Sequence, residues 1–204
     1  MPRSGQPREA GDDLRFKETM NQDQMIRLKE THLAPYIQLA TALIGKRRKS
    51  GGNMFRHQID TMGILLDYGY INSVLLKASV VHDLLEDIPD FDRDKLIGID
   101  AEGQEVFMLV LEVTRRHGVE TKDQFLERIL EYGSPMALVL KCADRISNMI
   151  SLGYTTDAVF IRRYADETER YIFPMAERAN HAMLAELKEL VITRRSCLEA
   201  QPSA

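Results

Sequence analysis

A cluster of ionisable side chains at the end of an apolar segment is the feature that most constrains the fold of this chain. Residues 74–81 are apolar at every position but two, and His82, Asp83, Glu86 and Asp87 follow. On one continuous helix, side chains four positions apart share a face, which pairs His82 with Glu86 and Asp83 with Asp87. Burying an imidazole and three carboxylates is costly unless a cation neutralises them. The segment therefore predicts a buried helix whose polar end binds a divalent metal ion.

Apolar residues recur at helical spacing along most of the chain. One stripe consists of Tyr36, Ile37, Ala40, Leu43 and Ile44, and a second consists of Ile59, Met62, Gly63 and Leu66 and ends at Gly69. Residues 104–114 and 124–132 show the same periodicity. No alternating apolar and polar pattern bounded by hairpin turns occurs, which argues against β-strands. The sequence therefore predicts an all-α fold.

Capping residues and prolines predict several helix boundaries. Asn72 or Ser73 is a suitable N-cap for the helix that carries His82, and Pro89 ends that helix just after Asp87.

The C-terminal half contains similar signals. Ser134 followed by Pro135 predicts the start of a helix over residues 136–149. Two last helical segments, 157–174 and 176–197, are expected to meet in a bend at Pro174.

The length of 204 residues suits one domain. Residues 1–20 and 199–204 are mostly polar and small, so we expect them to be disordered tails. A single domain is then expected over residues 21–198.

Composition excludes several classes of protein. No stretch approaches the roughly 18 uninterrupted apolar residues of a membrane span, and the N-terminus lacks the apolar core of a secretory signal, so we expect a cytoplasmic protein without a membrane partner. Neither Cys142 nor Cys197 belongs to a paired motif, which argues against zinc–thiolate and disulfide frameworks. The net charge of −4 argues against general nucleic-acid binding. Local basic clusters such as Arg48 and Lys49 remain compatible with a small polyanion.

His57 and Asp144 are the best candidates to complete a metal site with His82 and Asp83. His57 follows the flexible loop that Gly51 and its neighbouring glycine predict, and Asp144 lies on an apolar helix, where a lone carboxylate must be paired or metal-bound. Two imidazoles and two carboxylates suit Mn, Fe or Zn better than Ca. Each residue alone also suits an ordinary role, as a surface or core histidine or as a partner of a nearby arginine.

The order of these residues resembles a known family. His57, then His82-Asp83, then Asp144 reproduces the H…HD…D signature of HD-domain metal phosphohydrolases, and His82-Asp83-x-x-Glu86-Asp87 resembles the hydrolase domain of RelA/SpoT alarmone enzymes and the single-domain small alarmone hydrolases. Further matching segments are Arg48-Lys49-Ser50-Gly51, Glu112-Val113-Thr114-Arg115, Glu167-Thr168, Pro174-Met175-Ala176, and Lys141 to Met149, which is similar to K-L-A-D-R-L-H-N-M. The resemblance spans about residues 38–180.

The resemblance implies a fold, a metal site and an activity. The fold is an HD-domain bundle of roughly eight to ten helices. His57, His82, Asp83 and Asp144 are the implied ligands of one divalent ion, Mn²⁺ or a similar metal. Glu86 and Asp87 are the implied catalytic pair.

The resemblance further implies a nucleotide substrate. Hydrolysis would remove the 3′-diphosphate of (p)ppGpp as pyrophosphate and return GDP or GTP. Arg48 and Lys49 match the family's basic loop, and Asn148, one turn beyond Asp144, is the remaining candidate for substrate binding, although it equally suits a hydrogen bond within its helix.

The chain departs from the family around His57. Residues 53–56 replace the usual Pro-Tyr-Ile, and Gln58 stands where the family has proline. We expect these changes to line the route to the site and to affect substrate choice. An HD phosphohydrolase acting on NADPH or a nucleoside monophosphate, a non-catalytic nucleotide-binding regulator, and a purely structural helical bundle are therefore the alternatives.

Overall fold

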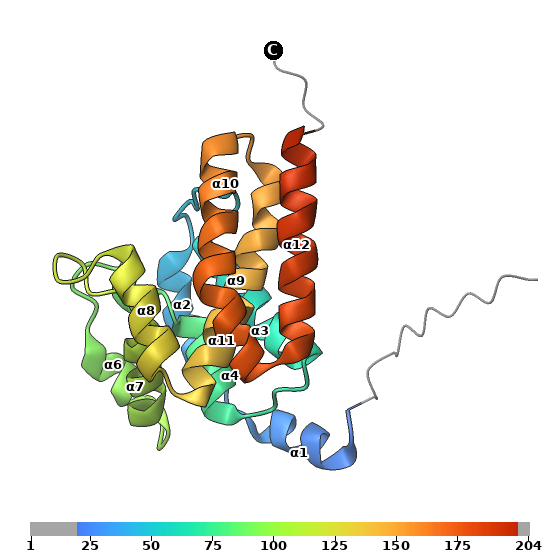
Figure 1. The fold of residues 1–204 in the computed structure, drawn as a ribbon. Helices are drawn as coiled ribbons and strands as arrows, with labels where there is room; N and C mark the ends of the chain where they lie inside the picture. Colours follow the sequence, from blue (N-terminus) through green and yellow to red (C-terminus); the bar gives the residue numbers. More distant parts are fainter. Residues whose placement is uncertain (1–19, 200–204) are drawn as a thin grey trace, which may run out of the picture.

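The computed structural model describes residues 20–199, in which all regular secondary structure is helical (Figure 1). The helices are α1 Gln22–Glu30, α2 Ala34–Ala40, α3 Met54–Asp67, α4 Ser73–Val81, α5 Leu84–Asp87, α6 Arg93–Ile97, α7 Gly103–Val113, α8 Lys122–Tyr132, α9 Pro135–Ser151, α10 Ala158–Glu167, α11 Phe173–Ala179 and α12 His181–Glu199. Short 3₁₀ turns occupy Thr41–Leu43 and Leu152–Tyr154, and a π-helical turn occupies Thr168–Ile172.

The predicted all-α bundle is confirmed. Within the described range, ten helices have seven or more residues, α5 and α6 are shorter, and no strand forms; Arg47 and Asn53 make only an isolated antiparallel bridge. The tails expected at residues 1–20 and 199–204 fall outside the described residues, apart from Met20 and Glu199. None of the described helices combines the length and apolarity needed to cross a membrane. Cys142 and Cys197 are both free, as expected.

Helix α9 is the centre of the bundle. It packs against α3, α4, α7, α8, α11 and α12. In Figure 1, α10 and α12 run alongside it, whereas α6, α7 and α8 gather on the other side of the molecule. The start of α9 agrees with the sequence, because the Ser134 hydroxyl accepts a hydrogen bond from the Ala137 amide at 3.2 Å and Pro135 occupies the first turn. Because α9 is central, polar side chains on it are buried, including Asp144 and Arg145.

The helix that leads to the ionisable cluster is interrupted. Asn72 caps α4 by accepting a hydrogen bond from the Leu75 amide at 2.9 Å, as predicted, and residues 74–81 are all buried. However, α4 ends at Val81, and a turn at His82 and Asp83 separates it from α5. The expectation of one continuous helix through Asp87 is therefore wrong. Consecutive residues of a regular helix point about 100° apart, and the turn instead lets the side chains of His82 and Asp83 face each other.

The buried faces of two predicted stripes also differ from expectation. On α3, the fully buried residues are His57, Gln58, Thr61 and Leu65, while Ile59, Met62, Gly63 and Leu66 are only partly buried. The polar residues of this face tolerate burial because hydrogen bonds satisfy them. In the first stripe, Ile44 is 58% exposed because it lies just beyond the 3₁₀ turn.

The C-terminal helices separate at a different position from the one predicted. Pro174 lies in the first turn of α11, and the irregularity expected there takes the form of the π-helical turn that precedes it. The chain turns into α12 at Asn180, whose side chain accepts hydrogen bonds from the amides of Ala182 and Met183 at 2.9 and 3.1 Å. An asparagine N-cap is a common helix start, but the apolar periodicity on both sides of it concealed this one.

Candidate metal centre

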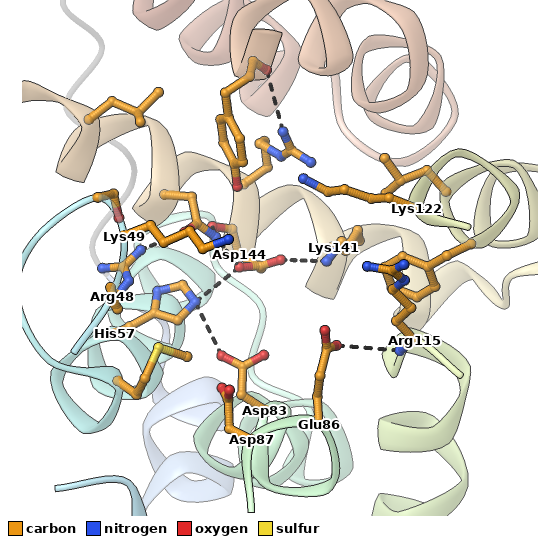
Figure 2. A pocket seen from close by; sticks show the side chains of 18 of the residues that line it. Arg48, Lys49, His57, Asp83, Glu86, Asp87, Arg115, Lys122, Lys141 and Asp144 are labelled. Carbon is orange, nitrogen blue, oxygen red and sulfur yellow. Dashed lines mark hydrogen bonds and ion pairs between the residues drawn. The ribbon is translucent and has the colours of Figure 1, made fainter. Parts of the chain in front are cut away.

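All four predicted ligands converge at one point of the bundle, and Figure 2 shows three of them, His57, Asp83 and Asp144. His57 comes from the first turns of α3, His82 and Asp83 from the turn between α4 and α5, and Asp144 from the middle of α9. The Nε2 atom of His57 lies 3.0 Å from Oδ1 of Asp144 and 3.6 Å from Oδ2 of Asp83. The Nε2 atom of His82 lies 3.3 Å from Oδ2 of Asp83 and 3.9 Å from Oδ1 of Asp144. His57, His82 and Asp144 each offer one possible metal-ligand atom, and these three atoms lie within 4.8 Å of one another.

The outer nitrogens of both imidazoles are held by the surrounding protein. His57 Nδ1 is 2.8 Å from the hydroxyl of Ser147, and His82 Nδ1 is 2.7 Å from the backbone carbonyl of Ser79. A carbonyl only accepts, so His82 Nδ1 carries a proton and donates it, which directs Nε2 toward the centre. Metal-ligating histidines are commonly oriented by such contacts.

One buried nitrogen in this centre lacks a hydrogen bond. His82 Nε2 is inaccessible to solvent and has no hydrogen-bond partner among the described residues. A buried polar atom without a partner is costly. A divalent cation would satisfy this nitrogen and the nearby carboxylates together, so the residues present fit a metal ion.

The charges of the centre are strongly coupled. Burial raises the pKa of Asp144, but Lys141 and the two histidines outweigh burial and hold that pKa well below its usual range. Burial lowers the pKa of His57 below its ordinary value despite the neighbouring carboxylates. Burial also disfavours a proton on His82, yet Asp83 and Asp144 raise its pKa overall to about 9. A cation would compete with a proton for His82, because both bind the same ring nitrogen.

Glu86 and Asp87 lie beside the four converging residues on the short helix α5. Figure 2 shows their side chains pointing into the same cavity as Asp83. A carboxylate oxygen of Glu86 lies 3.4 Å from the Arg115 amide, and the other lies 3.3 Å from Nε2 of His117. Burial, together with the charges of Asp83 and Glu86, raises the pKa of Asp87 to about 6. A carboxyl group with such a pKa can both accept and release a proton near neutral pH.

The three predicted substrate-binding residues lie on one side of the cavity. Arg48 donates hydrogen bonds to Oδ1 of Asn148 at 2.6 Å and to the hydroxyl of Ser151 at 2.9 Å. Asn148 in turn donates to the backbone carbonyl of Asp144 at 3.0 Å. Lys49 is exposed and lines the cavity beside Arg48. Asn148 thus makes both the hydrogen bond within its helix and a contact with the basic loop.

Several residues that sequence reasoning did not assign to the site also line the cavity, which has a volume of about 340 Å³. Five of them are cationic: Arg47, Arg115, Lys122, Lys141 and Arg145. Lys141 donates to Oδ2 of Asp144 at 2.7 Å, so its place in the segment around Asp144 was an available signal. Lys122 begins α8 and had no such signal, because only the packing of α8 beside α9 and α10 brings it to the cavity.

The residues around His57 were expected to line the route to the site, but only some of them do. Met54 lines the cavity, but Asn53 caps α3 by accepting a hydrogen bond from the Arg56 amide. Gln58 is fully buried and donates to Oδ2 of Asp83 at 2.8 Å. Gln58, which stands where the resembling family has proline, therefore contacts the candidate ligand Asp83.

The fold has a counterpart among solved structures. No protein-family model matches the sequence, and no curated protein does either. One matching structure is that of a metazoan ortholog of SpoT, a protein described as one that hydrolyzes ppGpp and plays a role in starvation responses. It is 20% identical in sequence with a TM-score of 0.65, and the match covers 79% of this chain and 94% of that one. The chain therefore has the fold of a metazoan ortholog of SpoT, in agreement with the HD-domain helical bundle predicted from the sequence.

Proposed function

We propose that this chain is a metal-dependent hydrolase that removes the 3′-diphosphate of (p)ppGpp as pyrophosphate and leaves GDP or GTP. The observation that carries the proposal is the convergence of His57, His82, Asp83 and Asp144 around a buried nitrogen that makes no hydrogen bond. The fold likeness to a protein described as a ppGpp hydrolase supports the choice of substrate.

The four converging residues would hold one divalent ion, with Mn²⁺ as the proposed native metal. A mixed set of imidazole and carboxylate ligands suits such an ion. When bound, it would polarise a phosphoryl oxygen and lower the pKa of a water molecule from about 15.7 toward 7.

Glu86 and Asp87 are proposed to handle the protons of the reaction. Cleavage between the ribose 3′ oxygen and phosphorus requires one proton to leave the attacking water and one proton to reach the 3′ oxygen. Two adjacent carboxyl groups beside the centre can accept the first and supply the second. The raised pKa of Asp87, about 6, suits it to exchange protons near neutral pH.

The cationic residues of the cavity support a polyanionic substrate. Arg48 and Lys49 lie on one side of His57, Asp83 and Asp144, and Arg115, Lys122 and Lys141 lie on the other (Figure 2). A substrate with two separated diphosphate groups would meet positive charge on both sides. Asn148 holds Arg48 in place and is proposed to contact the nucleotide together with it.

The test is an assay of the purified chain with Mn²⁺ and a panel of ppGpp, pppGpp, NADPH and nucleoside monophosphates. We expect turnover of ppGpp or pppGpp with release of pyrophosphate, and no turnover after chelation of the metal. Release of orthophosphate, or turnover of the other compounds alone, would contradict the proposed reaction. An Asp144→Asn variant serves as the inactive control. The cytoplasmic location expected from the sequence stays a prediction.

A further inference from the structure

Gln58 connects α3 to the turn between α4 and α5 through two contacts with one residue. Its side-chain amide donates to Oδ2 of Asp83 at 2.8 Å, and its side-chain oxygen lies 3.4 Å from the backbone amide of Asp83, which points toward it. Gln58 is fully buried. Its orientation follows from chemistry, because an ionised carboxylate only accepts hydrogen bonds and a backbone amide only donates them.

Asp83 occupies a position with two competing uses for its carboxylate. It is the N-cap residue of α5, and aspartate at an N-cap usually accepts a hydrogen bond from an amide of the first turn. Here its side chain makes no capping hydrogen bond. Oδ2 instead lies 3.3 Å from His82 Nε2 and 3.6 Å from His57 Nε2. The hydrogen bond from Gln58 therefore stabilises the arrangement in which this carboxylate faces the two histidines.

The same contacts influence the neighbouring carboxylates. The backbone carbonyl of Asp83 accepts hydrogen bonds from the amides of Glu86 at 3.2 Å and Asp87 at 2.9 Å. A shift of Asp83 would therefore move the start of α5 together with the side chains that α5 places in the cavity.

We infer that Gln58 is a positioning residue of the metal centre: it holds the Asp83 carboxylate in the ligand set and prevents it from capping α5. The inference rests on the proposed function, because it requires metal binding by Asp83. It is a property of this chain, since the proline that the resembling family carries at this position has no side-chain donor.

The main test is Gln58→Met, which keeps the approximate length of the side chain and removes both contacts. We expect the dissociation constant for Mn²⁺, measured by isothermal titration calorimetry, to rise roughly 10- to 100-fold, the usual effect of losing a residue that orients a ligand. The absorption spectrum of the Co²⁺-substituted protein should change, because it reports the number and arrangement of ligands. In the ppGpp assay, kcat should fall by a larger factor than any change in KM.

A matched control separates positioning from stability. Tyr36→Phe removes another partly buried hydrogen bond, the one of 2.8 Å from the Tyr36 hydroxyl to Asp100, at a place that does not line the cavity. It should lower the melting temperature and leave the Mn²⁺ dissociation constant and the Co²⁺ spectrum unchanged. A Gln58→Met protein that behaves like this control would overturn the inference.

Two further measurements keep the test decisive. In an Asp83→Ala background, Gln58→Met should have little additional effect on Mn²⁺ affinity, because Gln58 acts through Asp83; a full additional loss would contradict this. If Gln58→Met does not fold, Gln58→Asn, which keeps the amide but is one methylene shorter, should show a smaller loss of affinity, and wild-type affinity in that variant would reject the inference. Failure of the unaltered protein to bind Mn²⁺ or Co²⁺ would instead reject the proposed function.

Discussion

The guanidinium of Arg48 donates a hydrogen bond of 2.6 Å to the side chain of Asn148, a residue 100 positions further along the chain. Asn148 is bonded in turn to the backbone carbonyl of Asp144. The basic loop and the helix that carries a candidate metal ligand are thereby connected, and Arg48 is held at the edge of the cavity before any substrate binds.

Arg48→Lys should weaken substrate binding more than it slows the reaction. Lysine keeps the positive charge but cannot contact Asn148 and Ser151 at once, because it lacks the planar fork of arginine. We expect KM for ppGpp to rise by roughly 10- to 100-fold, the equivalent of one or two charged hydrogen bonds, with a smaller change in kcat. Steady-state kinetics measures both. Arg195→Lys, in an exposed ion pair on α12, is the control; an equal effect in both variants would exclude a specific role for Arg48.

His82→Ala should abolish tight metal binding. Its Nε2 is the buried nitrogen without a hydrogen bond, so this variant removes a candidate ligand atom together with the one hydrogen bond that Nδ1 donates to the Ser79 carbonyl. We expect calorimetry to detect little or no Mn²⁺ binding and the activity to fall to the level of the chelated wild-type protein. His181→Ala, at the exposed start of α12, should bind Mn²⁺ normally. Wild-type affinity in His82→Ala would remove His82 from the ligand set.

Glu86→Gln should separate catalysis from metal binding. The amide keeps the shape of the side chain but can neither accept nor donate a proton in the reaction. A general acid or base typically contributes about 100- to 10,000-fold, so kcat should fall within that range while the Mn²⁺ dissociation constant changes little. The exposed Glu105→Gln on α7 is the control. Unchanged kcat in Glu86→Gln would leave Asp87 as the sole candidate for proton transfer.

The pH dependence of the reaction should report Asp87. Its pKa is raised to about 6 before a cation binds, and a cation held by Asp83 would lower that pKa. Because the ionised form accepts the proton, kcat/KM should decrease as the pH falls through a value at or below about 6. Lys46 donates a hydrogen bond to the backbone carbonyl of Asp87, and its charge lowers the pKa of the Asp87 carboxyl. Lys46→Met should therefore move the acidic limb to higher pH, whereas Lys46→Arg should leave it nearly in place. If kcat/KM of Lys46→Met falls at the same pH as in the unaltered protein, the titrating group is not Asp87.

Glu167→Gln should destabilise the fold in a pH-dependent way. The Glu167 carboxylate lies 2.5 Å from the buried Arg145 guanidinium and 2.8 Å from the Lys122 ammonium. Burial raises the pKa of Glu167, but these two cations lower it overall. A carboxyl group with a lowered pKa stabilises the fold above its ordinary pKa of about 4.3, and this stability is lost as the pH falls through the lowered value.

Removing the charge of Glu167 leaves the buried Arg145 without its carboxylate partner, which should cost about 3 kcal/mol of unfolding free energy at pH 7. Urea unfolding at a series of pH values would measure the loss, and the difference from the unaltered protein should shrink as the pH is lowered below about 4. Glu169→Gln, in an exposed pair with Arg195, should cost less than about 1 kcal/mol. A loss for Glu167→Gln that is independent of pH would point to packing instead of charge.

Much of the fold could be predicted because it depends on residues close together in the sequence. Asn72 and Ser134 cap the helices where their side chains predicted, and Pro89 follows the end of α5. The turn at His82 and Asp83 could not be predicted in this way, because a run of helix-compatible residues continues through it and the contacts that Asp83 makes there are with Gln58 and His57 on α3, far away in the sequence.

The sequence by itself determined the candidate ligands. The cost of burying their charges made His57, His82, Asp83 and Asp144 candidates, and their order along the chain, which resembles the HD-domain signature, turned the candidates into a predicted ligand set; the structure brings all four together. Only the tertiary structure decided how the centre is surrounded. Gln58, Lys122 and Ser147 reach it because α3, α8 and α9 pack together, and such contacts depend on the relative positions of helices that no local pattern of residues specifies.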